Sequence, residues 1–370
     1  MNSGRYTERT RFLWKKINSK EGKRIGKDVF RMSSLKDSSM YYHVVLERIT
    51  PKATPAFEVP EMQERVWGNR WGVFNDVGAI KKILMHRPGN ELNIITKDKY
   101  DPQIDALIDD DEQWYFRSDQ GPNLPGMQAE HDALVKIMED NGAEVVYVDG
   151  GARDPNSMFT RDMGLVVNGG IIISRMGPVG KPYGTGRRGE EAYITKKVAE
   201  IGMPILHTIH GEGLMEGGSF CFLTDKIAAI SLSARGNPCA VKQVKNVLDV
   251  QGIELIEIPL VGFSMHLDGA IVMIDHDKAL VNVERLPYWF LDKLKELGIE
   301  AIYGDYRDIS FAVNCIALKP GKIIMDEFAP WTAEILSSKG VEVITTPYKE
   351  CRKHGGGIHC STLPLIRERN

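Results

Sequence analysis

Short apolar runs alternate with stretches of helical periodicity from residue 78 to the end of the chain. Between 127 and 141, apolar residues such as Leu134 and Met138 recur at the spacing of one helix face. Gly142 follows this stretch, where a glycine commonly ends a helix, and the apolar run 144–148 is typical of a strand. The pattern predicts an α/β protein built from short elements.

The same order of elements recurs along the chain, with two strands, a helix and a third strand in each unit of roughly 40–60 residues. Strands are predicted at 79–85, 144–148, 165–174, 204–208, 219–223, 227–232, 254–258, 270–274, 279–283, 300–303, 315–318, 322–325 and 342–346, and helices at 127–141, 190–201, 240–251, 289–297 and 331–339. A doubly wound sheet would alternate single strands with helices. A ring of units would instead hide every sheet edge and leave a central channel, and we predict such a ring.

The composition excludes several classes of protein. No apolar run in the 370 residues reaches the roughly 18 that a membrane span needs, and 47 Lys and Arg against 50 Asp and Glu argue against a nucleic-acid partner. The five cysteines are an odd number without a Cys-x-x-Cys pair, so we expect a reducing, cytoplasmic location rather than disulfides. His207 and His210 have no evident third ligand, and we expect no metal and no cofactor.

Four polar clusters occupy the same place in successive units, near the first strand of each. They are Phe-Thr-Arg-Asp at 159–162, Glu-Gly-Gly at 216–218, His-Leu-Asp at 266–268 and Gly-Gly-Gly-Ile-His-Cys at 355–360. Each alone has an ordinary structural explanation, such as an inert core position for Cys360. In a ring, however, equivalent positions converge on the axis, so Asp162, Glu216, His266, Asp268 and Cys360 would share one pocket.

These side chains suit covalent attack on a cation. A thiol titrates at about 8.5 and needs a base or a nearby cation to become a nucleophile, and His266 can donate and accept protons. Three carboxylates around one thiol favour a positively charged substrate. A planar guanidinium pairs bidentately with carboxylates, so two aspartates could hold it while the thiolate attacks its central carbon.

Several ordered segments resemble the guanidino-group modifying superfamily, which includes arginine deiminases, dimethylargininases, agmatine deiminases and arginine amidinotransferases. The resemblance spans roughly residues 72–367 and is carried by the segments 78–92, 128–148, 156–162, 265–278 and 355–367. It implies an α/β-propeller of five ββαβ units, the pentein fold, in agreement with the repeat pattern.

The resemblance also implies a role for each site residue. Cys360 is the nucleophile and His266 the acid and base. Asp162 and Asp268 hold the guanidinium nitrogens, while Glu216 bonds the histidine or the guanidinium. Further substrate-binding positions are Asn156, Arg161, Arg187, Arg235 and His354; for Arg187 and Arg235, an ordinary surface position is the alternative.

The chain departs from arginine deiminases near the end of the pocket that would bind the amino-acid part of the substrate. Ser219 stands where those enzymes usually have Asp, His354 stands where they have Arg, and Ile358 lengthens the nucleophile loop by one residue. The resemblance therefore implies the chemistry more firmly than the substrate. We predict a deiminase-type hydrolase of an arginine-like compound that gives a ureido product plus ammonia or an amine.

Three alternatives remain open. An amidinotransferase would pass the amidino group to an amine, and the context after Cys360 also resembles those enzymes. A non-catalytic binding protein or scaffold would not need the thiol. A papain-like protease fits poorly, because that family places its Cys well before its His.

Residues 1–60 are predicted to form a basic N-terminal extension, and residues 61–370 the catalytic domain. Between Arg5 and Lys27, nine basic side chains stand against two acidic ones, and no apolar core of a secretory signal is present. We interpret the extension as a solvated arm or one that bridges subunits of a homo-oligomer. A cleaved organelle-targeting segment is the weaker alternative.

Overall fold

The computed structural model describes residues 36, 38–50, 54–151, 154–177 and 186–369, which belong to two compact units. The first unit ends at Pro55 and contains helix α2 (Tyr41–Ile49). The second unit begins at Ala56, and α3 (Pro60–Trp67) is its first helix. Most of the predicted basic extension lies outside the described residues, so its role stays a prediction. No helix in the described part of the chain is long and apolar enough to cross a membrane.

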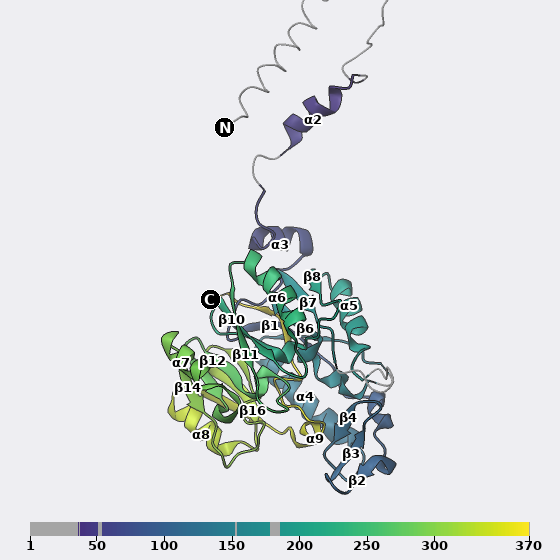
Figure 1. The fold of residues 1–370 in the computed structure, drawn as a ribbon, viewed down its shortest axis with the longest axis vertical. Coiled ribbons are helices and arrows are strands. Elements are labelled where there is room, and N and C mark those ends of the chain that lie inside the picture. The colour runs from purple at the N-terminus through teal and green to yellow at the C-terminus, as the bar shows by residue number, and fades with distance from the viewer. Residues whose placement is uncertain (1–35, 37, 51–53, 152–153, 178–185, 370) are drawn as a thin grey trace, which may run out of the picture. The chain divides into compact units, whose positions relative to one another are not determined.

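The second compact unit contains four complete ββαβ units. Each follows the predicted order of two antiparallel strands, a helix and a third strand parallel to the second. They comprise β6 (Gly164–Val167), β7 (Gly170–Ile173), α5 (Glu190–Glu200) and β8 (Ile205–Thr208); β9 (Phe220–Phe222), β10 (Ile227–Leu232), α6 (Pro238–Val250) and β11 (Glu254–Pro259); β12 (Ile271–Asp275), β13 (Lys278–Val281), α7 (Tyr288–Glu296) and β14 (Glu300–Tyr303); and β15 (Ile316–Lys319), β16 (Lys322–Asp326), α8 (Pro330–Ser338) and β17 (Glu342–Thr346). Figure 1 shows these units following one another in colour from teal to yellow.

The fifth sheet has the same topology but combines segments from opposite ends of the second compact unit. Its central strand β1 (Ile80–Met85) pairs antiparallel with β18 (Leu363–Arg367) and parallel with β5 (Glu144–Tyr147), which follows α4 (Leu124–Asp140). The register places Leu84 opposite Leu363. The last strand of the chain therefore supplies the first strand of this unit.

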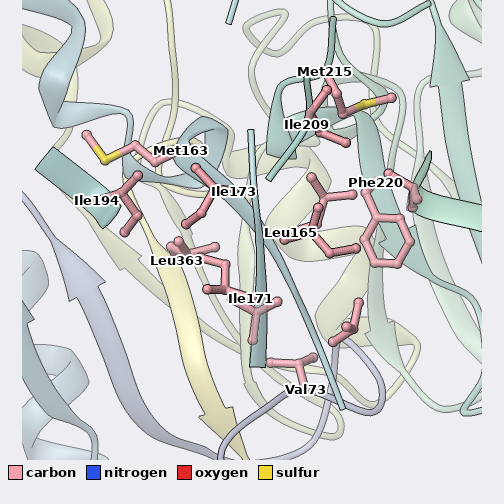
Figure 2. Packing of buried hydrophobic residues seen from close by; sticks show 14 of the residues in the cluster. Val73, Met163, Leu165, Ile171, Ile173, Ile194, Ile209, Met215, Phe220 and Leu363 are labelled. Carbon is pink, nitrogen blue, oxygen red and sulfur yellow. The ribbon is translucent and has the colours of Figure 1, made fainter. Parts of the chain in front are cut away.

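Three clusters of buried apolar side chains connect the five sheets in cyclic order. The first joins the β1–β18 sheet to β6–β8 and β9–β11; Figure 2 shows part of it, with Leu363, Leu165 and Phe220 among the labelled residues. The second joins β9–β11 to β12–β14 and β15–β17. The third packs Ile316 and Ile324 with Ile80 and Ile83, and so returns to the first sheet. Five sheets of the predicted topology are present, and their packing order is the one expected of the predicted ring.

Some elements were not predicted from the sequence. These are helices α2 and α3, strand β18, the short helix α9 (Lys349–Arg352), and a separate meander of β2 (Tyr100–Asp101), β3 (Ala106–Asp109) and β4 (Trp114–Phe116). The meander lies between β1 and α4 in the chain and at the lower edge of the second unit in Figure 1. It lacks a long alternating pattern because its strands have only two to four residues.

Candidate active site

Each of the five units contributes polar residues directly before its first strand. Short 3-10 turns at Thr160–Met163, Gly217–Ser219 and Leu267–Gly269 precede β6, β9 and β12. These three turns carry or follow the site residues Asp162, Glu216, His266 and Asp268. Asn314 and Cys360 stand before β15 and β18.

The glycines after Glu216 allow two of these turns to approach each other. A Cβ on Gly217 would lie 2.1 Å from the Arg161 carbonyl oxygen, and one on Gly218 would lie 2.7 Å from Asp162 Oδ1. The Gly218 N–H instead donates to Asp162 Oδ1 at 3.1 Å. Any larger residue would push Asp162 away from the histidine described next.

We use the term histidine half of the site for His266, Glu216, Asp162, Arg187 and Arg235. His266 Nε2 lies 2.6 Å from Glu216 Oε2, and its Nδ1 lies 3.6 Å from Asp162 Oδ1. Burial lowers the pKa of His266, but the two carboxylates outweigh it and raise this pKa to about 9. The imidazole is therefore protonated at neutral pH.

Two arginines neutralise the carboxylates of the histidine half. Arg235 Nη1 donates to Glu216 Oε1 at 3.0 Å. Burial acts to raise the pKa of Glu216, but its bond to His266 and the surrounding cations bring this pKa to about 2. Arg187 Nη1 lies 2.5 Å from Asp162 Oδ2, and both Nε and Nη2 donate to the buried Glu190 at 2.8 Å. Arg187 is thus largely engaged by protein carboxylates.

We use the term cysteine half of the site for Cys360, Asp268, His359 and Asn314. Cys360 Sγ lies 3.5 Å from Asp268 Oδ2, which also accepts a bond from His359 Nδ1 at 2.9 Å. Burial, followed by the charges of Asp268 and Asp162, raises the pKa of the Cys360 thiol well above its usual range. Burial also lowers the pKa of His359, so this histidine is a neutral donor. The resting site therefore holds a thiol rather than a thiolate.

The two halves face a small pocket of about 80 Å³. Eight of the ten predicted site residues line it, namely Asp162, Glu216, His266, Cys360, Asn156, Arg187, Arg235 and His354. His354 stacks on Phe159 at 5.6 Å between ring centroids, and burial lowers its pKa to about 4. It is therefore neutral and cannot replace the charge of an arginine at this position.

The other two predicted residues, Asp268 and Arg161, are not part of the pocket lining. Asp268 lies next to Cys360, with Oδ2 3.5 Å from the sulfur. Arg161 lines a separate cavity of about 10 Å³ together with Asp76, and only 7% of its surface is exposed. Arg161 is thus not among the residues that line the pocket, and its contact with a substrate stays a prediction.

Several lining residues were not predicted. Trp114 and Tyr115 come from β4 of the meander. Met265 precedes the predicted site residue His266, and Phe159 begins the polar cluster 159–162 but was given no role. Phe159 and Met265 could have been found by their adjacency to Thr160 and His266. Trp114 and Tyr115 had no such signal, because the meander itself was not recognised.

One group in the described residues has the geometry of a metal site. The candidate ligand atoms of Asp162, Glu216 and His266 all lie within 4.8 Å of one another. Each carboxylate is already paired with an arginine, and the histidine is protonated. A metal ion would have to displace that proton, so the group is better suited to hold an organic cation. His207 instead bonds Gln243 at 2.8 Å.

Five ββαβ units that direct a cysteine, a histidine and carboxylates into one pocket define a guanidino-group modifying protein of the pentein fold. The family model described as N,N dimethylarginine dimethylhydrolase, eukaryotic, matches residues 113–367. The chain belongs to this family.

Individual relatives agree with this assignment. An arginine deiminase of Treponema denticola is 23% identical, with 80% of this chain and 98% of the relative covered. A 2-nitroimidazole nitrohydrolase of a Mycobacterium species is 28% identical, with 82% of this chain and 84% of the relative covered. These relatives, together with the family, support a hydrolase.

Solved structures confirm the predicted fold. A cysteine-to-serine variant of the Pseudomonas aeruginosa dimethylarginine dimethylhydrolase family enzyme, in complex with citrulline, superposes with a TM-score of 0.62 at 23% identity and covers 78% of this chain and all of its own. An amidinotransferase of saxitoxin biosynthesis from Microseira wollei gives a TM-score of 0.61 at 15% identity, with 81% and 98% covered. Because hydrolases and a transferase share the fold, the fold alone does not select the second half-reaction.

Proposed function

We propose that this protein hydrolyses the guanidino group of an arginine-like compound through a covalent adduct on Cys360. The products are a ureido compound and either ammonia or an amine. The observation that carries the proposal is the convergence of a buried thiol, a protonated histidine and carboxylates on one small pocket. The family match and the arginine deiminase relatives support cleavage of a carbon–nitrogen bond in a guanidino group.

The carboxylates supply the acceptors that a guanidinium requires. A guanidinium has five N–H donors and no acceptor, so it can bond Asp162 at one end and Asp268 at the other. Asp162 retains acceptor capacity, since each of its oxygens has one recorded protein partner within hydrogen-bond distance and two lone pairs. Binding between the aspartates would bring the central carbon close to Cys360 Sγ, which lies 3.5 Å from Asp268.

The remainder of the substrate is proposed to contact Asn156, His354 and Arg235. Arg235 is the better placed of the two pocket arginines, because 18% of its side chain is exposed against 8% for Arg187. Its recorded bonds, among the described residues, all use Nη1. Nε and Nη2 are therefore proposed to receive a substrate carboxylate.

Substrate binding also activates the nucleophile in this proposal. The thiol is held protonated by burial and by the carboxylates nearby. A bound guanidinium adds a positive charge beside the sulfur and favours the thiolate, and the thiol proton passes to solvent. A reactive thiolate then forms only when its target is in place.

The two half-reactions balance with His266 as the proton carrier. The thiolate forms a C–S bond to the guanidinium carbon, and the imidazolium protonates the leaving nitrogen as the C–N bond breaks. The neutral imidazole then takes a proton from water as the water oxygen attacks the amidino-thioether carbon. Collapse breaks the C–S bond and releases the thiolate and the ureido product, while the remaining hydroxyl proton passes to solvent and His266 stays protonated for the next cycle.

Transfer of the amidino group to an amine remains the alternative, because a structurally similar amidinotransferase has the same fold. Incubation with a panel of guanidino compounds in ¹⁸O-labelled water distinguishes the two by mass spectrometry. Hydrolysis should give multiple turnovers and one ¹⁸O atom in the ureido product. Transfer should stop after one equivalent and resume, without ¹⁸O incorporation, when glycine, lysine or ornithine is added. Absence of both turnover and a Cys360 adduct would overturn the proposal and favour a binding protein.

A further inference from the structure

Asn314 occupies in the fourth unit the place that the other four units give to the proposed catalytic residues. It precedes β15, as Cys360 precedes β18, and it is 3% exposed. Its side chain contacts the nucleophile twice. Oδ1 accepts the Cys360 backbone N–H at 3.1 Å, and Nδ2 lies 3.2 Å from Cys360 Sγ.

The surrounding groups determine the orientation of the Asn314 amide. Oδ1 faces an N–H, and Nδ2 also lies 3.3 Å from the Asp268 carbonyl oxygen, which is only an acceptor. A flipped amide would place its NH₂ against the Cys360 N–H and its oxygen against that carbonyl. The N–H donor must therefore point toward the sulfur.

The backbone of Asn314 is also tied to the nucleophile loop. Its carbonyl accepts the His359 N–H at 3.2 Å, and its own N–H donates to Phe311 at 2.9 Å. A Cβ on Gly357 would lie 2.5 Å from Asn314 Oδ1, so a glycine there permits the close approach. The amide is thus fixed before any substrate arrives.

Deprotonation of Cys360 creates a charge that most of its neighbours oppose. Asp268 Oδ2, at 3.5 Å, can accept a hydrogen bond from the Cys360 thiol, but it repels the thiolate that forms after deprotonation. The groups that favour the thiolate are the Gly357 backbone N–H and the Asn314 amide. A fixed N–H dipole stabilises a developing charge without having to reorganise during the reaction.

We infer that Asn314 is a catalytic residue, whose amide N–H donates to Cys360 Sγ and stabilises the thiolate that attacks the substrate. The inference rests on Cys360 being the nucleophile proposed above. It adds a donor from the fourth unit, so that all five units contribute to the reaction.

The test compares Asn314→Asp and Asn314→Ala with wild type in thiol alkylation by iodoacetamide, measured against pH without substrate. Asn314→Asp keeps the size and the bond accepted from Cys360 N–H but replaces the donor with a carboxylate. Because a hydrogen bond to a charged group is lost, the midpoint of the alkylation profile should rise by roughly 1–2 pH units in both variants. The kcat of turnover at neutral pH should fall about 10- to 100-fold for the same reason.

Asn75→Asp is the matched control. Asn75 is also buried and accepts backbone N–H bonds from Val77 and Gly78 through Oδ1, but no recorded contact links it to Cys360. Its alkylation midpoint should match wild type. If Asn314→Ala does not fold, Asn314→Asp alone decides, with its melting temperature checked against wild type. An unchanged midpoint in a folded Asn314 variant would overturn the inference even if turnover falls. If the alkylation midpoint rises in the Asn314 variants but wild type turns over none of the guanidino compounds, the role of Asn314 is supported and only the proposed substrate class is contradicted.

Discussion

The histidine half and the cysteine half of the pocket hold their polar groups in different ways. In the histidine half, Asp162 and Glu216 are each paired with an arginine, and His266 carries a proton. In the cysteine half, Asp268 is held by the neutral His359, and the adjacent thiol is uncharged. One half is built from charges that are already compensated, and the other from neutral groups around a single carboxylate.

In the proposed reaction, this difference assigns proton transfer to the histidine half and activation of the nucleophile to the cysteine half. A compensated ion-pair network keeps His266 protonated and in place, ready to act on a leaving nitrogen. Asp268 in the cysteine half bonds His359, and the nearby charges of His266 and Arg161 help to lower its pKa, but no arginine bonds it directly among the described residues. An incoming cation could therefore form a direct ion pair with this carboxylate. The substrate itself would complete the charge balance on that side and convert the thiol to a nucleophile.

The largest expected effect comes from removing the sulfur. Cys360→Ala should abolish turnover, since no other group can form the covalent bond, while guanidino compounds should still bind. Steady-state kinetics and calorimetry check the two parts. Cys239→Ala is the control and should retain activity, because Cys239 is exposed and distant in the chain. Turnover near wild type in Cys360→Ala would show that the cysteine half has been misassigned.

The next effect comes from the histidine half. His266→Ala should lower kcat by about 10²–10⁴-fold, because it removes the acid for amine departure and the base for water. Intact-mass spectra should then reveal an adduct that accumulates on Cys360. A nearly normal rate would remove His266 from the mechanism and leave the thiol to act with solvent alone.

Substitution of Arg187 tests whether this residue stabilises the fold through its ion pairs or binds the substrate. Arg187→Met leaves Asp162 and Glu190 without their cation and should destabilise the fold by about 3–5 kcal/mol. Urea denaturation measures this loss. Arg188→Met is the neighbouring control, since Arg188 is more exposed and lies 3.7 Å from Glu191. If Arg187→Met has wild-type stability but a raised KM, the sequence-based prediction of substrate binding is correct and the present interpretation is wrong.

The smallest expected effect is a change with pH in the free energy of unfolding. The pKa of His266 is raised from 6.5 to about 9 in the folded protein, so its stabilising contribution is complete below pH 6.5 and is lost as pH rises to about 9. We expect wild type to lose about 1–3 kcal/mol relative to His266→Gln across this window. Denaturation of both proteins at pH 6 and pH 9.5 provides the comparison. A pH-independent difference would mean that the folded protein does not favour the imidazolium.

The sequence predicted the repeated units because most strand pairs and helices have their own apolar pattern. The count of five was implied by the resemblance, since β18 was not predicted. It also indicated the residues that converge, since Asp162, Glu216, His266 and Cys360 recur at one place in the repeat. The same reasoning could have identified Asn314, which stands at that place before β15. It was missed because Ala312 and Val313 make the segment resemble ordinary core.

Other features could not be derived from local pattern. The sequence shows that Arg187 lies near Glu190, but not that Asp162, 25 residues earlier in the turn before β6, approaches the same guanidinium. Likewise, Arg161 is adjacent to Asp162 in the chain yet lines a different cavity. Such partners depend on how loops pack within a unit and between neighbouring units, which residue spacing along the chain does not determine.

The pairing of β1 with β18 has a consequence for the order of events during synthesis. A chain made from its N-terminus exposes β1, the meander and the histidine half before β18 and Cys360 exist. Long-range pairs such as Leu84 with Leu363 form late and slowly. The proposed nucleophile therefore arrives on the segment that pairs last, and an incompletely folded chain would have no assembled thiol site.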